Sequence, residues 1–184
     1  MIHPTALLLL ALTALPASTI GEDAEAAKAP KPNEVPAEAR AVLESADELV
    51  LYALHPNEQV QGNERTLNLQ EFVALGRATV KDDAHRNVLK QLFRGVEDWN
   101  GMMAHCFMPR HGIRAIKGDN TVDLVVCFEC MQLYVYVDDQ RLDTIGIGNG
   151  VEPAVSALFE AAGLEIDGRK KKQKASKRSA ARDG

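Results

Sequence analysis

Apolar residues recur at helical spacing in only a few parts of the chain. Between residues 82 and 96 the apolar positions follow a helical period, with Gly95 near the end, which predicts the longest helix. Residues 152–163 predict a closing helix, with Pro153 in its first turn and Gly163 at its end. A short helix is expected at residues 36–44, where Pro36 suits the first turn.

β-forming residues dominate most of the remaining apolar sequence. Strands are expected at residues 48–54, 70–80, 103–107, 112–117 and 121–128, with a tight turn at 117–120 joining the last two. The β-forming run then continues to residue 138, whereas strands are usually about 3–10 residues long. The run contains neither Gly nor Pro, so we expect a turn at residues 127–131. A strand at 132–137 and a short edge strand at 143–147 should follow.

This order of elements predicts an α+β fold. We expect an antiparallel sheet of about five to six strands, with one long central helix and a C-terminal helix packed on one face. A parallel sheet would need regular alternation of strands and helices, which the pattern lacks.

The first 20 residues predict a signal peptide. An apolar run at residues 6–15 ends at Pro16 and is followed by small residues, so cleavage is expected within residues 17–26. The run is too short for a transmembrane segment, which needs about 20 residues. No cysteine precedes Cys106, which excludes a lipid anchor at the leader. We therefore expect an exported protein, periplasmic or extracellular.

Composition divides the rest of the chain into three parts. Residues 21–36 are charged and proline-containing without apolar periodicity, which predicts a disordered linker before a single domain at 37–166. Residues 167–184 form a basic tail, predicted to be disordered. Residues 169–184 hold eight of the 21 Lys and Arg but one of the 26 acids. We interpret the tail as a solubilising end whose residues 169–182 make weak electrostatic contact with polyanions. The alternative is a tail that binds nucleic acid, anionic lipid or an acidic wall polymer.

All three cysteines fall within residues 105–137, the most strand-like part of the chain. The spacing of Cys127 and Cys130 suits a disulfide, which the predicted compartment permits and which leaves one cysteine over. It also suits a structural zinc site, completed by Cys106 and His111 or His105. Reduced thiols in the core are the third alternative. A thioredoxin-like centre is disfavoured, because β-formers rather than a helix follow the motif.

Two arginines and a histidine bracket the bend expected at Pro109 and Gly112. Arg110 and Arg114 would form an anion-binding pocket, or would pair with acids such as Asp123 and Glu129. Paired with Cys106, His111 would resemble a nucleophilic site. The alternative to a non-catalytic domain is therefore a thiol- or metal-dependent enzyme that uses the three cysteines with His111.

The pattern Cys-Phe-x-Pro-Arg-His-Gly-Ile-Arg, followed about a dozen residues later by Val-Asp-Leu-Val-Val-Cys-Phe-Glu-Cys, resembles a group of small exported bacterial proteins of uncharacterised function. The similarity runs from about residue 43 to about residue 163. It implies export and brings no activity, cofactor or substrate with it. We therefore expect an exported, non-catalytic binding or structural domain in which the Cys/His cluster fastens the sheet.

Overall fold

The structure is a computed structural model that describes residues 33–59 and 69–166. The predicted signal peptide, the basic tail and most of the predicted linker lie outside these residues. The end of that linker is described, and it packs on the domain. The side chain of Asn33 donates to the carbonyl of Val96 at 3.0 Å and accepts from the amide of Gly146 at 2.6 Å. Val35 is buried in the core.

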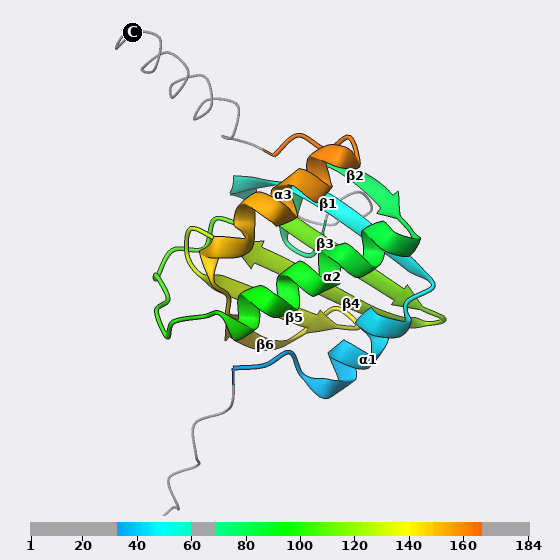
Figure 1. Cartoon of the computed structure of the whole chain (residues 1–184), viewed down its shortest axis with the longest axis horizontal. Coiled ribbons are helices and arrows are strands. Elements are labelled where there is room, and N and C mark those ends of the chain that lie inside the picture. The colour runs from blue at the N-terminus through cyan, green and yellow to red at the C-terminus, as the bar shows by residue number, and fades with distance from the viewer. Residues whose placement is uncertain (1–32, 60–68, 167–184) are drawn as a thin grey trace, which may run out of the picture. The chain divides into compact units, whose positions relative to one another are not determined.

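A six-stranded antiparallel sheet organises the domain (Figure 1). Its strand order is β2-β1-β3-β4-β5-β6, so the last four strands follow one another as a meander and β1 pairs with β3. The strands are β1 (Glu48–Gln59), β2 (Phe72–Val80), β3 (His111–Lys117), β4 (Asn120–Cys127), β5 (Gln132–Val137) and β6 (Gln140–Gly146). The register of β2 against β1 shifts on either side of Leu54, and that of β6 against β5 shifts between Val135 and Tyr136.

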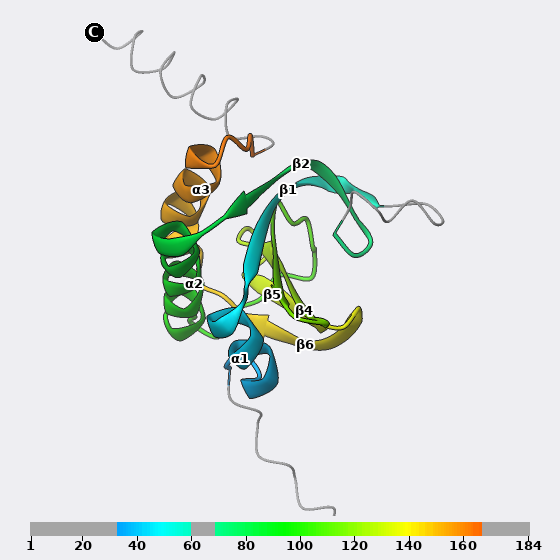
Figure 2. The same ribbon diagram turned by 90° about the vertical axis from the view of Figure 1, so that its right-hand side faces the viewer.

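Three short helices lie on one side of the sheet (Figure 2). They are α1 (Ala37–Ser45), α2 (Asp82–Glu97) and α3 (Glu152–Ala161), and a 3-10 turn, η2 (Asn149–Val151), precedes α3. The predicted fold with one long central helix is therefore wrong. The reason is the width of the apolar face: six strands span about 24 Å, whereas one helix is about 10 Å across. All three helices are therefore used to cover that face.

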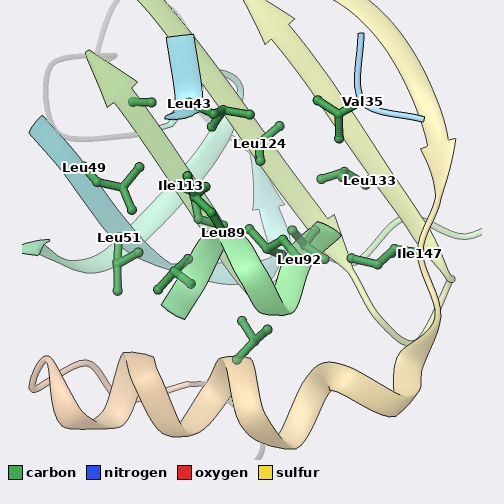
Figure 3. Close-up of a cluster of buried hydrophobic side chains, with 14 of the residues drawn as sticks. Val35, Leu43, Leu49, Leu51, Leu89, Leu92, Ile113, Leu124, Leu133 and Ile147 are labelled. Carbon is green, nitrogen blue, oxygen red and sulfur yellow. The ribbon is translucent and has the colours of Figure 1, made fainter. Parts of the chain in front are cut away.

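The main core lies between the helices and the sheet (Figure 3). Alternate residues of each strand point to this side, as the two-residue period of a strand requires. Helix α2 contributes the apolar stripe expected from its spacing. The labelled core residues are Val35, Leu43, Leu49, Leu51, Leu89, Leu92, Ile113, Leu124, Leu133 and Ile147.

A second apolar cluster covers the opposite face of the sheet. It contains Val50, Tyr52, Leu54, Leu69, Phe72, Val125 and Tyr136. Leu69 reaches across β3 at Gly112, where an added Cβ would lie 2.4 Å from the Leu69 Cδ2 atom. Glycine is therefore required at this position by the close approach of Leu69. Because both faces are covered, the central strands are buried almost throughout.

Two strand predictions need correction. Residues 103–107 form no strand, because the contact of Ala104 with the carbonyl of Cys130 is not continued as a ladder. Strand β1 runs past the predicted stop at residue 54 and includes Pro56. Beyond Ala53 it has no register partner on β3, so a residue without an amide proton is tolerated there. The turn predicted at 127–131 is confirmed, and Met131 adopts a φ of 54° in it.

Candidate functional site

The three cysteines meet at the turn between β4 and β5. Cys127 ends β4, and its sulfur forms a disulfide with Cys130 in the turn, with the two Cα atoms 5.2 Å apart. Both residues are buried, with exposed fractions of 1% and 0%. The backbone amide of Cys130 donates a hydrogen bond to the Cys127 sulfur at 3.1 Å. The disulfide is therefore enclosed and one of its sulfurs is already hydrogen-bonded.

Cys106 approaches this disulfide from a different part of the chain. Its sulfur lies 3.5 Å from the Cys130 sulfur, and the residue is exposed and carries a free thiol. Contacts on both sides hold the segment in place. The Ala104 amide donates to the Cys130 carbonyl at 2.9 Å, and the ring of Phe107 stacks on Tyr134 with centroids 3.6 Å apart. Cys106 is thus a surface thiol fixed beside a buried disulfide.

His111 lies at the start of β3 and is 1% exposed. Its Nε2 atom is hydrogen-bonded to the hydroxyl of Ser156 on α3 at 2.8 Å. The rings of Phe128 and Phe159 pack edge-on against the imidazole. His111 therefore connects the sheet to α3. The described residues include no group of three or more metal-ligating side chains placed to hold an ion. His105, the other candidate ligand, is exposed.

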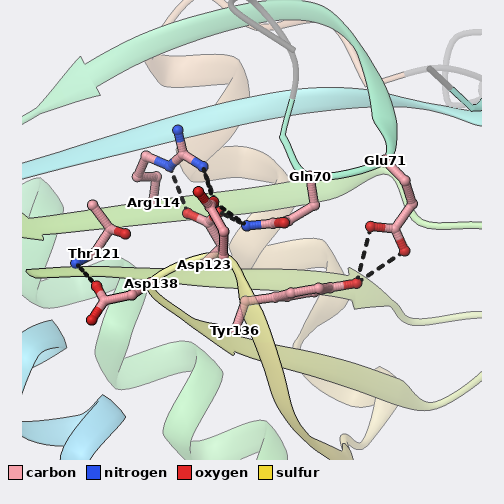
Figure 4. A network of polar contacts seen from close by, with 8 residues as sticks. Gln70, Glu71, Arg114, Thr121, Asp123, Tyr136 and Asp138 are labelled. Atoms are coloured by element: carbon pink, nitrogen blue, oxygen red, sulfur yellow. Dashed lines mark hydrogen bonds and ion pairs between the residues drawn. The ribbon is translucent and has the colours of Figure 1, made fainter. Parts of the chain in front are cut away.

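Both arginines of the motif contact acids from its second half. Arg110 lies 3.2 Å from the carboxylate of Glu129. Arg114 forms two hydrogen bonds with Asp123, of 2.7 and 2.6 Å (Figure 4). These are the acid partners that the sequence offered as the alternative to an anion site. The two halves of the motif are therefore joined by two ion pairs as well as by the β3–β4 ladder.

The Arg114–Asp123 pair extends into a network on the face opposite the helices. Asp123 is 2% exposed and also accepts a hydrogen bond of 2.6 Å from the Gln70 amide, which reaches Asp139 at 3.1 Å. The hydrogen bonds that Arg114 donates to Asp123 raise the pKa of Arg114 further above its usual range, although burial lowers it. The arginine therefore stays charged beside Asp123.

A tyrosine and a glutamate form a neighbouring contact on the same face. The hydroxyl of Tyr136 donates to the carboxylate of Glu71, at 3.0 and 3.2 Å from its two oxygens (Figure 4). Burial raises the pKa of Tyr136 well above its ordinary value, and the negative charge of Glu71 adds to the effect. Neither Gln70 nor Glu71 was singled out by the sequence. Their partners are 53 and 65 residues away, and no local pattern encodes such contacts.

An open hollow of about 580 Å³ lies away from the cysteines, where the end of α1, the end of β2 and the start of α2 meet. Its lining carries both signs of charge: Glu44, Asp47 and Asp82 are acidic, and Lys81, Arg86 and Lys90 are basic. Asp47 is hydrogen-bonded to Lys117 at 2.7 Å, which lowers the pKa of this carboxyl. The mixed charge indicates no ligand class for the hollow.

Comparison of the chain with models of protein families, with curated proteins and with solved structures finds no match. No helix among the described residues is long and apolar enough to cross a membrane.

Proposed function

We propose that this chain is an exported, non-catalytic domain with a binding or structural role, in which the Cys127–Cys130 disulfide fastens the sheet. The observation that carries the proposal is the buried disulfide itself. Disulfides persist in oxidising compartments and are rare where thiols are kept reduced. The bond is compatible with the export expected from the apolar leader at residues 6–15.

The disulfide fastens the sheet at one place, the turn that joins β4 to β5. Its loop spans residues 127–130, and a loop of that length corresponds to about 2 kcal/mol in the chain-entropy model. The same turn holds Met131 in the left-handed region, which costs a residue with a side chain about 1–2 kcal/mol. The bond therefore offsets the strain of a turn that has neither Gly nor Pro.

The rival function is a thiol- or metal-dependent enzyme that uses the three cysteines with His111. The contacts of His111 favour the structural role, because its Nε2 atom engages Ser156 and two aromatic rings enclose it. A structural zinc site would need Cys127 and Cys130 as free thiolates, and these sulfurs are bonded to each other. Zinc binding is therefore expected only when the Cys127–Cys130 disulfide is reduced.

Analysis of protein recovered from the envelope or medium of its native host tests the proposal. We expect a chain shortened within residues 17–26, one free thiol per molecule and no stoichiometric zinc. Cys127→Ser together with Cys130→Ser should lower the free energy of unfolding by about 2 kcal/mol. The matched variant Cys106→Ser should leave it unchanged. Recovery of full-length chain from the cytoplasm, or three free thiols, would overturn the proposal.

A further inference from the structure

The buried disulfide and the exposed thiol beside it form a single chemical unit. We propose that Cys106, Cys127 and Cys130 constitute a thiol–disulfide relay that captures an external thiol as a mixed disulfide on Cys106. The proposal goes beyond the fastening role, which stands whether or not the relay operates. It concerns a stoichiometric reaction at the site and assigns a ligand class, a low-molecular-weight or peptide thiol.

An external thiol could reach the buried disulfide only through the exposed Cys106. With exposed fractions of 1% and 0%, Cys127 and Cys130 are closed to attack by a molecule from solution. Cys106 is exposed but, as a free thiol, has no disulfide to exchange. Transfer of the bond from Cys127 to Cys106 would bring a reactive disulfide sulfur to the surface.

The geometry favours this transfer. The Cys106 and Cys130 sulfurs are 3.5 Å apart, and a bond between them requires an approach to about 2.05 Å. Cys106 belongs to a segment outside any helix or strand, anchored two residues earlier at Ala104 and one residue later at Phe107. We expect the Cys106 side chain and this short segment to close the remaining gap between the sulfurs.

In the first step the Cys106 thiol loses its proton to water, and the thiolate attacks the Cys130 sulfur. The Cys106–Cys130 bond forms while the Cys127–Cys130 bond breaks. The electron pair of the broken bond goes to Cys127, which leaves as a thiolate and takes a proton from water. The Cys130 amide already donates to the Cys127 sulfur at 3.1 Å, so the departing charge has a hydrogen-bond donor. The number of disulfides is unchanged, and no oxidant is required.

In the second step an external thiolate attacks the exposed sulfur of Cys106. A bond forms between the external sulfur and Cys106, the Cys106–Cys130 bond breaks, and Cys130 leaves as a thiolate that is then protonated. The protein disulfide is consumed as the oxidising group, and the products are one mixed disulfide and two cysteine thiols. The captured molecule is attached at the surface, next to the stacked rings of Phe107 and Tyr134.

Reaction of the oxidised full-length chain with reduced glutathione, quenched by acid at early times, tests the relay. Mass mapping should find glutathione on Cys106 and free thiols at Cys127 and Cys130. The native disulfide should be lost at least tenfold faster in the wild type than in Cys106→Ser. This variant changes an exposed residue, and its melting temperature reports that the fold is intact.

A trapping variant provides the second readout. Cys127→Ser removes the leaving group, so Cys106 and Cys130 should join in a stable disulfide under mild oxidation. Equal rates of disulfide loss in wild type and Cys106→Ser, or glutathione on Cys127 or Cys130 in place of Cys106, would overturn the relay. So would folded Cys127→Ser protein that keeps two free thiols. The fastening proposal would survive these results, since it depends on thiol count and stability.

Discussion

Arg114 and Asp123 face each other across the adjacent strands β3 and β4, joined by two parallel hydrogen bonds of 2.7 and 2.6 Å. Paired contacts of this kind between a guanidinium and a carboxylate are among the stronger polar interactions in proteins. Asp123 is almost completely buried, so water cannot stabilise its negative charge. The hydrogen bonds from Arg114 stabilise that charge in its place. The pair therefore links the two halves of the sequence motif energetically as well as spatially.

Asp123→Asn should lower the free energy of unfolding by about 2 kcal/mol, because hydrogen bonds to a charged group are lost while the shape is kept. Urea denaturation measures the change. Asp119→Asn, an equivalent charge change on an exposed residue of the β3–β4 turn, should stay within about 0.5 kcal/mol of wild type. Equal stability of the two variants would contradict the role of the pair.

Gly112→Ala should destabilise the domain by about 1–3 kcal/mol, because the new methyl group would meet the side chain of Leu69 at 2.4 Å. Gly150→Ala is the control, since an added Cβ there meets nothing within 4 Å. A double-mutant cycle locates the cause. In a Leu69→Ala background the cost of Gly112→Ala should fall by more than about 0.5 kcal/mol. Additive costs would show that the strain lies elsewhere.

Stability should decline with rising pH above about 10, partly through Tyr136. Its pKa is raised in the folded domain, so the unfolded chain loses the phenol proton near pH 10 while the folded chain keeps it. The contribution is complete below pH 10 and is lost as the pH rises toward the raised folded pKa. Tyr136→Phe should flatten this decline in denaturation measured from pH 8 to 11. Tyr134→Phe is the control: it leaves Tyr136 in place, so the decline in stability with rising pH should remain.

Ser156→Ala should cost about 1–2 kcal/mol, because it leaves a nitrogen of the buried His111 without the hydroxyl that lies 2.8 Å away. Thermal denaturation of the variant checks this. Ser45→Ala removes a hydroxyl from an exposed site at the end of α1 and should have an effect below about 0.5 kcal/mol. A Ser156 variant as stable as the Ser45 variant would show that His111 does not need this partner.

The basic tail gives a prediction from sequence alone, since residues 167–184 lie outside those described. Eight bases should produce weak, salt-sensitive retention on an anionic resin, because such binding comes from released counterions. Truncation after residue 168 should remove the retention and leave the melting temperature unchanged. Unchanged retention of the truncated chain would direct attention to Arg110 and Arg114.

The hairpin between β3 and β4 shows how far sequence reasoning extends. A tight turn at residues 117–120 pairs Lys117 with Asn120, and counting back along both strands brings Arg114 opposite Asp123. The pairing register of β3 and β4 can therefore be predicted from the local sequence. The turn at 127–131 was likewise required by the length of the β-forming run. In both cases the information is local.

Other contacts between distant segments could not be predicted in this way. The three cysteines were expected to lie together, but Cys106 reaches Cys130 through a segment that was predicted to be a strand and instead runs without a ladder. Gln70 reaches Asp123 from a turn whose own sequence gives no sign of a partner. The number of helices that cover the sheet depends on the width of its apolar face, which is known only once the strands are paired. These features follow from tertiary packing, which no short window of sequence contains.

The two edge strands of the sheet have irregular pairing with their neighbours, and each carries an exposed arginine, Arg77 on β2 and Arg141 on β6. A second copy that added its own edge strand would need a regular ladder to extend, and edge-to-edge pairing of like strands would bring like charges together. We therefore expect both edges to oppose growth of the sheet from one molecule into the next.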